Sequence, residues 1–232
     1  MSDALITALT ELDLQRVEAV IRGNPDSVNG EIRFRNMTPL HCAAWLDFPQ
    51  AVKLLLSHGA DPHKKTQGEM TPLHYAVSAN DPSSTLMLLE AGAGVDAESS
   101  SKLTPLHAAA ANGRKDNVII LLERGADLRR AEELRKKTAL HFAVEHNHPD
   151  VVDVLLERMA QSRVGDVNAV DVDDWTPLHL ASRFNLTEIA RKLVEAGAEA
   201  DIMNKAGETA LDVASFYTNT EMFVYLFLSI LG

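Results

Sequence analysis

The chain has 232 residues, of which 46% are hydrophobic and 24% are charged, proportions typical of a folded, soluble protein. Its formal net charge of −11 at pH 7 disfavours DNA or RNA as a partner, because an acidic surface repels phosphates. The single cysteine, Cys42, excludes an internal disulfide and favours a reducing compartment, so we expect a cytoplasmic location and leave the nucleus open as a second one.

The two ends of the sequence carry no targeting or membrane signal that we recognise. The start, MSDALITALTELDL, lacks the basic segment and apolar core of a signal peptide. Residues 13–29 are typical of a helix followed by a turn. The longest apolar run, 222–231, is shorter than the ~20 residues that span a bilayer. We therefore expect no membrane span.

From residue 38 onward, a short motif recurs along the chain. TPLH begins at 38, 71, 104 and 176, TALH at 138 and TALD at 209, and the starts are 33, 33, 34, 38 and 33 residues apart. A period this regular is typical of stacked helical repeats. We number each copy from its Thr, which is slot 0. Slot 3 is then His in five copies, slot 5 is Ala in all six, and slot 21 is Gly in four full repeats, with Met159 as the exception.

Each copy predicts two short helices and a turn. Thr at slot 0 followed by Pro predicts the start of a first helix. Slot 9 should end that helix, because most of its residues tolerate a left-handed backbone: Asp47, Asn80, Gly113, Asn147, Asn185 and Thr218. A second helix should follow, opened by Pro49, Pro82 and Pro149 in three copies and apolar at slots 14, 17 and 18. About a dozen residues then lead back to the next Thr.

A helix pair of this kind cannot bury its apolar faces alone, but stacked copies can. The TPLHxAA…LL…GAD pattern, with DVNA at 166–169, resembles the ankyrin repeat over residues 38–232, and the segment 13–29 extends the resemblance toward the start. It implies an all-α ankyrin-repeat solenoid of about seven helix–turn–helix units with projecting, β-turn-like fingers. We expect one domain, 1–232, with approximate units 3–37 (N-terminal cap), 38–70, 71–103, 104–137, 138–175, 176–208 and 209–232 (C-terminal cap).

The repeated histidines give no support for catalysis or metal binding. The resemblance makes the slot-3 imidazole a hydrogen-bonding group between a helix start and the neighbouring turn, and units roughly 10 Å apart cannot converge on one metal. We expect His146 on the groove face and His148 as a cap of the next helix, although VEHNHPD superficially suggests zinc. Cys42 should be a small core residue. No catalytic or phosphate-binding motif is present, so we predict no enzyme, no cofactor and no metal.

The resemblance places slots 7 and 8 and the residue before each Thr on a concave, partner-binding groove. The candidate partner-binding residues are these, together with Arg135 from a charged turn: Met37, Trp45, Leu46, Met70, Leu103, Asn112, Arg135, Lys137, Glu145, His146, Trp175, Arg183, Phe184, Phe216 and Tyr217. Large apolar groups that a stack does not need to bury are typical of interfaces. The alternative is that the two tryptophans only brace neighbouring turns.

Three further features depart from a plain repeat. The turn 126–137 carries a local charge of +2 and the turn 160–175 a local charge of −3, which would orient a partner of opposite pattern, or would be a solvated surface only. The repeat with Met159 has five extra residues, so its second helix should run one turn longer and end at Gly165. In the last unit, Val224, Leu228 and Ile230 leave the helix apolar on all sides, which favours cover by a second copy, a partner or a membrane interface over an imperfect cap.

These patterns predict a non-enzymatic protein–protein interaction module or scaffold that binds a protein partner through its groove and turn tips. An assembly chaperone or a regulatory subunit of a larger complex is the alternative within the same class. An enzyme and a nucleic-acid binder are the rivals from other classes, and motif content and charge respectively disfavour them.

Overall fold

The computed structural model describes residues 3–31 and 35–231 of the chain. The described residues form fourteen α-helices and one 3-10 helix, with no strand. The first seven elements are α1 (Asp3–Thr10), α2 (Leu14–Gly23), η1 (Pro25–Asn29), α3 (Pro39–Trp45), α4 (Pro49–Ser57), α5 (Pro72–Ala76) and α6 (Ser83–Glu90). The others are α7 (Pro105–Ala111), α8 (Lys115–Glu123), α9 (Ala139–Glu145), α10 (Pro149–Ser162), α11 (Pro177–Arg183), α12 (Thr187–Glu195), α13 (Ala210–Phe216) and α14 (Thr220–Leu231).

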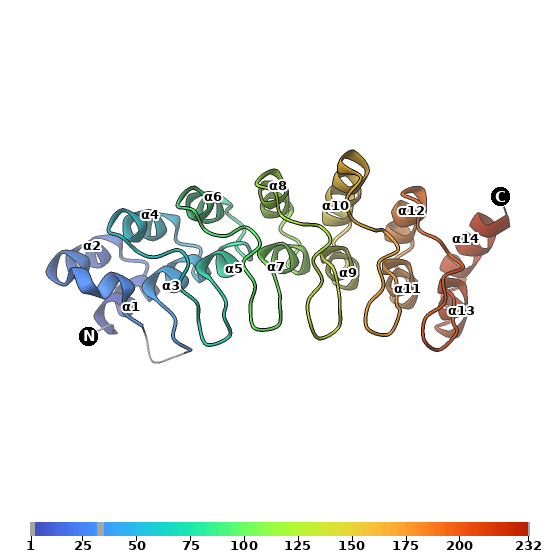
Figure 1. Cartoon of the computed structure of the whole chain (residues 1–232), viewed down its shortest axis with the longest axis horizontal. Coiled ribbons are helices and arrows are strands. Elements are labelled where there is room, and N and C mark those ends of the chain that lie inside the picture. The colour runs from blue at the N-terminus through green and yellow to red at the C-terminus, as the bar shows by residue number, and fades with distance from the viewer. Residues whose placement is uncertain (1–2, 32–34, 232) are drawn as a thin grey trace. The chain divides into compact units, whose positions relative to one another are not determined.

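One helix pair lies in each of the seven predicted ranges, so the prediction of an all-α repeat fold is confirmed (Figure 1). The segment 13–29 forms α2 and η1, as expected. The chain divides into two compact units: the first comprises residues up to Ala109 together with Glu123–Ala126, and the second comprises Ala110–Leu122 and the residues from Asp127 onward. The expectation of a single domain stays a prediction.

Leucines and alanines make the core of each unit. In the first unit Leu40, Leu55, Leu73 and Leu88 are fully buried, and in the second Leu121, Leu140, Leu155 and Leu178 are fully buried. Burying one such side chain stabilises the fold by about 2 kcal/mol. The alanines at slot 5 share a fully buried side chain, which lets neighbouring helices approach closely: Ala43, Ala76, Ala109, Ala143, Ala181 and Ala214.

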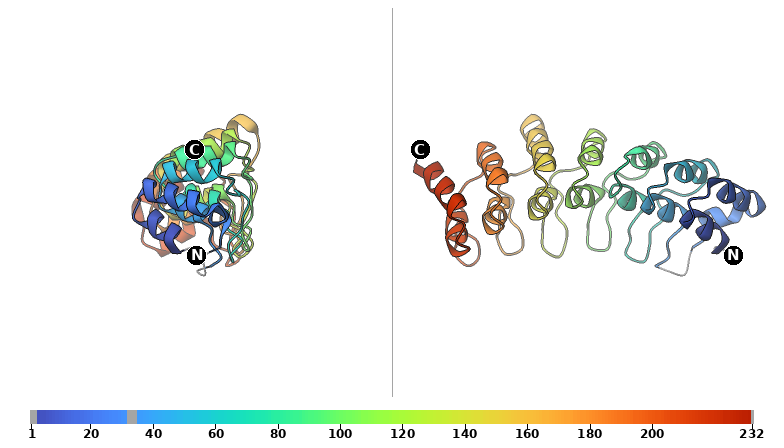
Figure 2. Two further views of the ribbon diagram at one scale, coloured as in Figure 1. Left: turned by 90° about the vertical axis from the view of Figure 1, so that its left-hand side faces the viewer. Right: turned by 180° about the vertical axis from the view of Figure 1, so that it is seen from behind.

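The long turns of each unit are joined by backbone hydrogen bonds. In the first unit Gln67 N donates to Arg35 O at 2.9 Å, and in the second Val172 N donates to Arg135 O at 2.7 Å. The turns before α11 and α13 project side by side from the same end of their helices (Figures 1 and 2), and Lys205 N donates to Asp173 O at 3.1 Å between them. These turns are the projecting fingers that the repeat pattern predicts.

The residues predicted to have a left-handed backbone at slot 9, and the glycines at slot 21, do have it with one exception. Slot-21 glycines have positive φ, 82° at Gly59 and 93° at Gly197 for example, and five of the six slot-9 residues also do. The prediction was wrong for Asn80, which does not share the left-handed φ, because α5 ends earlier than the other first helices, at Ala76. Pro82 also lies one residue before α6 and not in its first turn.

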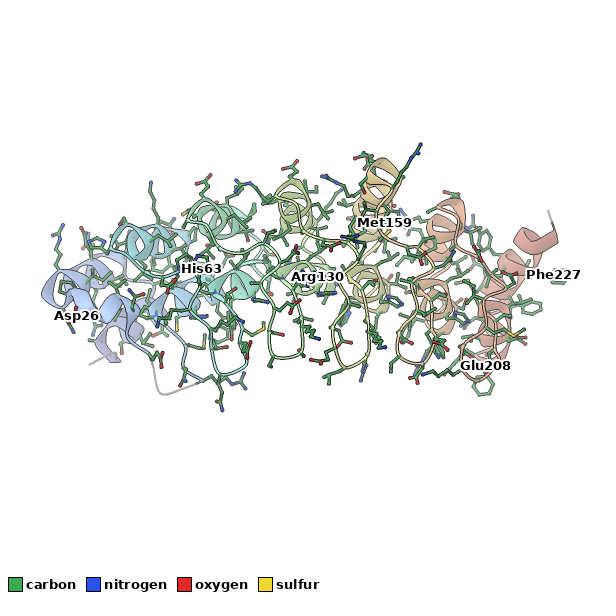
Figure 3. The ribbon with its side chains drawn as sticks, in the orientation of Figure 1. Asp26, His63, Arg130, Met159, Glu208 and Phe227 are labelled. Atoms are coloured by element: carbon green, nitrogen blue, oxygen red, sulfur yellow. The ribbon has the colours of Figure 1, made fainter. Side chains whose placement is uncertain are left out.

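The repeat that carries Met159 was predicted correctly in length but not in its cap. Its second helix, α10, extends to Ser162, more than one turn beyond α8 or α12 in their own repeats. The left-handed cap is Arg163, with φ 53°, and Gly165, with φ 96°, lies in the turn that follows. Gly165 packs on Met159, since a Cβ there would lie 2.9 Å from Met159 Cγ. Figure 3 places Met159 on α10.

The last helix leaves apolar side chains in solvent. In α14, Met222 and Leu226 are buried, whereas Val224, Phe227 and Leu228 are 48%, 47% and 61% exposed, and Figure 3 shows Phe227 projecting away from the helix. Ile230 lies outside the residues whose side chains the structure describes. None of the helices in the described ranges is long and apolar enough to cross a bilayer.

Candidate functional site

A buried threonine–histidine pair holds the start of the first helix in five repeats, and Thr209 with Asp212 takes its place at α13. At α9, Thr138 N donates to His141 Nδ1 at 3.3 Å, and the Thr138 hydroxyl lies 2.9 Å from the same nitrogen. Nδ1 is therefore an acceptor, so the ring proton is on Nε2, which donates to Trp175 O at 3.0 Å. His41, His74 and His179 repeat both contacts, with Met70, Leu103 and Glu208 as the carbonyl partners. The predicted structural role of these histidines is confirmed.

Burial keeps these rings neutral. Desolvation lowers the pKa of His41 to about 4 and lowers the pKa of His74, His141 and His179, although the hydrogen bond to each backbone carbonyl opposes the change. A neutral imidazole with both nitrogens engaged can neither exchange a proton with a substrate nor coordinate a metal. The histidine row belongs to the fold.

The other chemically reactive candidates are also engaged or buried. Cys42 is 6% exposed, and burial raises the pKa of its thiol to about 11, which removes the thiolate. His148 lies at the N-cap of α10 as expected, but its ring does not cap that helix: Nε2 donates to Ala111 O at 3.0 Å. His146 Nδ1 lies 3.0 Å from Phe142 O. Within the described ranges, no three His, Cys, Asp or Glu side chains group as metal ligands.

In the first unit, the candidate partner-binding residues, which lie just before the first helices or at their ends, differ in exposure. Trp45, the last residue of α3, is 66% exposed, and the next residue, Leu46, is half-buried. Met70 and Leu103 are half-buried and give their carbonyls to histidines. The expected exposure of Met37 is wrong, because only 7% of this residue is accessible.

The second unit begins with a polar stretch of candidates. Asn112, Arg135 and His146 are exposed. Lys137 was expected on the partner-binding surface, but it is 5% exposed, and its Nζ lies 2.8 Å from the carboxylate of Glu145. Lys137 takes the place of an apolar residue that four other repeats have before their Thr, and a buried ammonium needs a partner.

The remaining candidates form an aromatic–arginine cluster, which comprises Trp175, Arg183, Phe184, Phe216 and Tyr217. Arg183, at the end of α11, has its guanidinium carbon 5.6 Å from the ring centroid of Trp175, 5.5 Å from that of Phe184 and 5.9 Å from that of Tyr217. Phe216 packs edge-on against Tyr217 at 5.2 Å and is 76% exposed. The structure thus brings five of the predicted residues together.

Sequence reasoning missed how the turns are stabilised. Glu132, Asp171 and Asn204 are at most 8% exposed and accept hydrogen bonds from backbone N–H groups of their own turns. Thr66 and Ser99 do the same through their hydroxyls. The recurring polar residue five or six positions before each Thr could have revealed this role. The local charges of +2 for the turn 126–137 and −3 for the turn 160–175 therefore include two buried carboxylates that a partner does not reach, Glu132 and Asp171.

Comparison with known proteins agrees with this architecture. The sequence profile described as "Ankyrin repeats (3 copies)" matches residues 5–100, 40–132, 73–166 and 159–230. Two solved structures are similar over nearly the whole chain: the ankyrin repeat domain of human ASB11 (TM-score 0.83, 27% identity, 97% of this chain and 96% of that one) and that of Bcl-3, described as a unique member of the IkappaB protein family (TM-score 0.78, 28% identity, 95% and 97%). The chain belongs to the ankyrin-repeat family.

Curated relatives match only locally. Protein phosphatase 1 regulatory subunit 12A of Mus musculus is 47% identical over 49 residues, which are 21% of this chain and 5% of that protein. A putative ankyrin repeat protein of Rickettsia bellii (strain RML369-C) is 39% identical over 66 residues, 28% of this chain and 39% of that protein. The matched segments are less than half of each relative's length. Ankyrin repeats generally mediate protein–protein interactions, and the ankyrin-repeat fold is typically a non-enzymatic interaction domain.

Proposed function

We propose that the chain is a non-enzymatic binding module that holds a protein partner on the exposed ends of its first helices and on its turn tips. The observation that carries the proposal is the exposure of large aromatic side chains there: Trp45 is 66% and Phe216 is 76% accessible. Neither is needed to fill the core, and aromatic residues left in solvent are typical anchors of interfaces.

The chemistry of the buried groups supports a module without catalysis. The Cys42 thiol has a raised pKa, and four slot-3 histidines are hydrogen-bonded and have a lowered pKa: His41, His74, His141 and His179. A binding role in the cytoplasm, with the nucleus as the second location, is part of the proposal, because a chain with one buried thiol needs no oxidising compartment.

Capture of partners from an extract of the producing cells tests the proposal. We compare the wild type with Trp45→Ala and with Phe216→Ala, and we use Lys53→Ala as the control because Lys53 is an exposed residue of the second helix α4. A protein captured by the wild type is purified and titrated. We expect at least one aromatic variant to weaken binding about tenfold or more, as truncation of an interface anchor does. A greater loss with Lys53→Ala than with either variant would refute the assignment.

A second candidate is a regulatory subunit or assembly chaperone of a larger complex. The local similarity to protein phosphatase 1 regulatory subunit 12A favours it. Gel filtration of the captured complex distinguishes the two forms. A regulatory subunit stays with the complete complex, whereas a chaperone is found with a single unassembled component.

The exposed apolar face of α14 adds a further contact to the proposal, with a second copy of the chain or with the partner. Sedimentation equilibrium of the wild type beside a Val224→Glu, Leu228→Glu variant tests self-association. A wild type that stays monomeric over a wide concentration range excludes a second copy, and loss of partner binding in the variant then identifies a heterologous contact.

A further inference from the structure

Arg183 is held by aromatic rings and by no carboxylate. Its guanidinium lies 5.5–5.9 Å from the ring centroids of Trp175, Phe184 and Tyr217. Across the described residues, no Asp or Glu oxygen lies within ion-pair distance of it. Arg22, Arg129 and Arg16 behave differently, because each has a carboxylate partner in its own unit.

This geometry leaves the hydrogen-bond donors of Arg183 available. A guanidinium that interacts with ring faces still has five N–H groups in its own plane. Arg183 is exposed, as are Phe184 and Tyr217, which are 43% and 42% accessible. A guanidinium next to apolar rings has fewer water partners, and this strengthens its interaction with a ligand of opposite charge.

A carboxylate is the group that matches these donors. Its two oxygens accept two parallel N–H bonds from one guanidinium. An ammonium group such as that of Lys cannot form this paired arrangement. The neighbouring Phe216, 76% exposed and in contact with Tyr217, offers an apolar surface beside the cation. A ligand that uses both features carries an acidic group next to an apolar one.

The surrounding charge limits the ligand to a single carboxylate. The turn that ends at Trp175 also carries Asp173 and Asp174, and Glu208 precedes α13 in the next turn (Figure 3). With a total charge of −11 on the chain, a polyanion such as a nucleic acid or a phosphorylated membrane surface would be repelled. An Asp or Glu side chain brings one negative charge, which Arg183 neutralises.

Resting on the proposed function, we infer that the aromatic–arginine cluster binds an Asp or Glu side chain of the partner protein, with an adjacent aliphatic or aromatic residue of the same segment on Phe216. Arg183 supplies the charge and the hydrogen bonds, and the rings of Trp175, Phe184 and Tyr217 fix its orientation. The cluster therefore selects an acidic residue beside an apolar one, and not apolar residues alone.

Selection of a displayed random-peptide library on the full chain tests the inference. The library is selected in parallel on the wild type, on Arg183→Met, on Phe216→Ala and on Arg124→Met, a control that removes an exposed arginine from the end of α8. We expect peptides from the wild type and the control to share an acidic position next to an apolar one. Arg183→Met should lose the acidic preference and keep the apolar one.

A double-mutant cycle on one selected peptide makes the result quantitative. Peptide Glu→Gln and protein Arg183→Met should each weaken binding about tenfold, and the combination should cost no more than either alone, because both remove the same interaction. Additive losses would overturn the inference. So would Phe216-dependent peptides without an acidic position, although these leave the proposed function standing. Failure to select any peptide that depends on Phe216 would also overturn the inference, whereas the proposed function is contradicted only if Trp45→Ala leaves partner binding unchanged as well.

Discussion

The two ends of α11 differ in how they are built. At its start, Thr176 and His179 are each 1% exposed and bonded to each other, and the His179 ring reaches Glu208 O at 3.0 Å. At its end, Arg183 and Phe184 are exposed, and the guanidinium carbon of Arg183 lies 5.5 Å from the Phe184 ring centroid. In α3 the same contrast holds between His41, fully buried, and Trp45, 66% exposed. The slot-3 histidine, which is the same in nearly every copy, holds the fold, whereas slots 7 and 8, which vary between copies, carry exposed side chains at the ends of these two helices.

The pH dependence of stability should show the largest effect of the helix starts. The pKa of His41 is lowered to about 4 in the fold, from an ordinary value near 6.5, and the pKa values of His74, His141 and His179 are also lowered. Between pH 4 and pH 6.5 the unfolded chain binds more protons than the folded chain. The free energy of unfolding should therefore be highest above about pH 6.5 and should decline as the pH falls toward 4.

For His41 alone the decline should be about 2 kcal/mol at pH 5.0 and about 3 kcal/mol near pH 4. Urea titrations at pH 7.5, 6.0 and 5.0 measure it, and His41→Gln should have the shallower pH dependence. Stability that stays constant from pH 7.5 to 5.0 would mean that the histidines are not held neutral.

Removing one histidine should cost nearly as much. In His74→Ala, the Thr71 N–H and the Leu103 carbonyl lose their partners inside the fold, so we expect a loss of about 3 kcal/mol. Thermal unfolding measures this loss. The matched control is His146→Ala at the exposed end of α9, which should change stability by less than about 0.5 kcal/mol.

The sequence was most informative where copies agree. The histidine slot, the buried alanine and the slot-21 glycine could be predicted because one physical requirement recurs in each copy. The burial of Lys137 could not be predicted, because it depends on a partner at another slot. The backbone of Asn80 could not be predicted either, because slot 9 is also Asn in two other copies and only the early end of α5 distinguishes it. Lys137 pairs with Glu145, eight residues away, and no periodic pattern reveals that the two side chains meet.

The Lys137–Glu145 pair sharpens the comparison, because a buried residue just before α9 here depends on a residue at the end of that helix. Lys137→Met leaves Glu145, 24% exposed at its side chain, without a cation, and should cost about 2 kcal/mol. Met occupies the same slot at Met37 and Met70, and Ser78 is at the slot of Glu145. The double variant Lys137→Met, Glu145→Ser should therefore regain most of the loss in a denaturant titration. An undiminished loss in the double variant would contradict the pairing.

The smallest effect concerns the residue two positions before each Thr. This position has a left-handed backbone in Lys102 (φ 56°), Lys136 (φ 57°) and Gly207 (φ 77°). Glycine adopts it without strain, so Lys102→Gly should leave stability unchanged or raise it by up to about 1 kcal/mol, and Gly207→Ala should lower it by about 1 kcal/mol. Melting temperatures of the two variants check the opposite signs.

Thermal unfolding of the Trp45→Ala, Phe216→Ala double variant tests most directly whether the helix ends are free of a structural role. Both side chains are more than half exposed, so the melting temperature should stay within about 2 °C of the wild type, whereas His74→Ala should melt far lower. A double variant that loses as much stability as His74→Ala would show that these aromatic residues support the fold, and the division between the two ends of the first helices would be wrong.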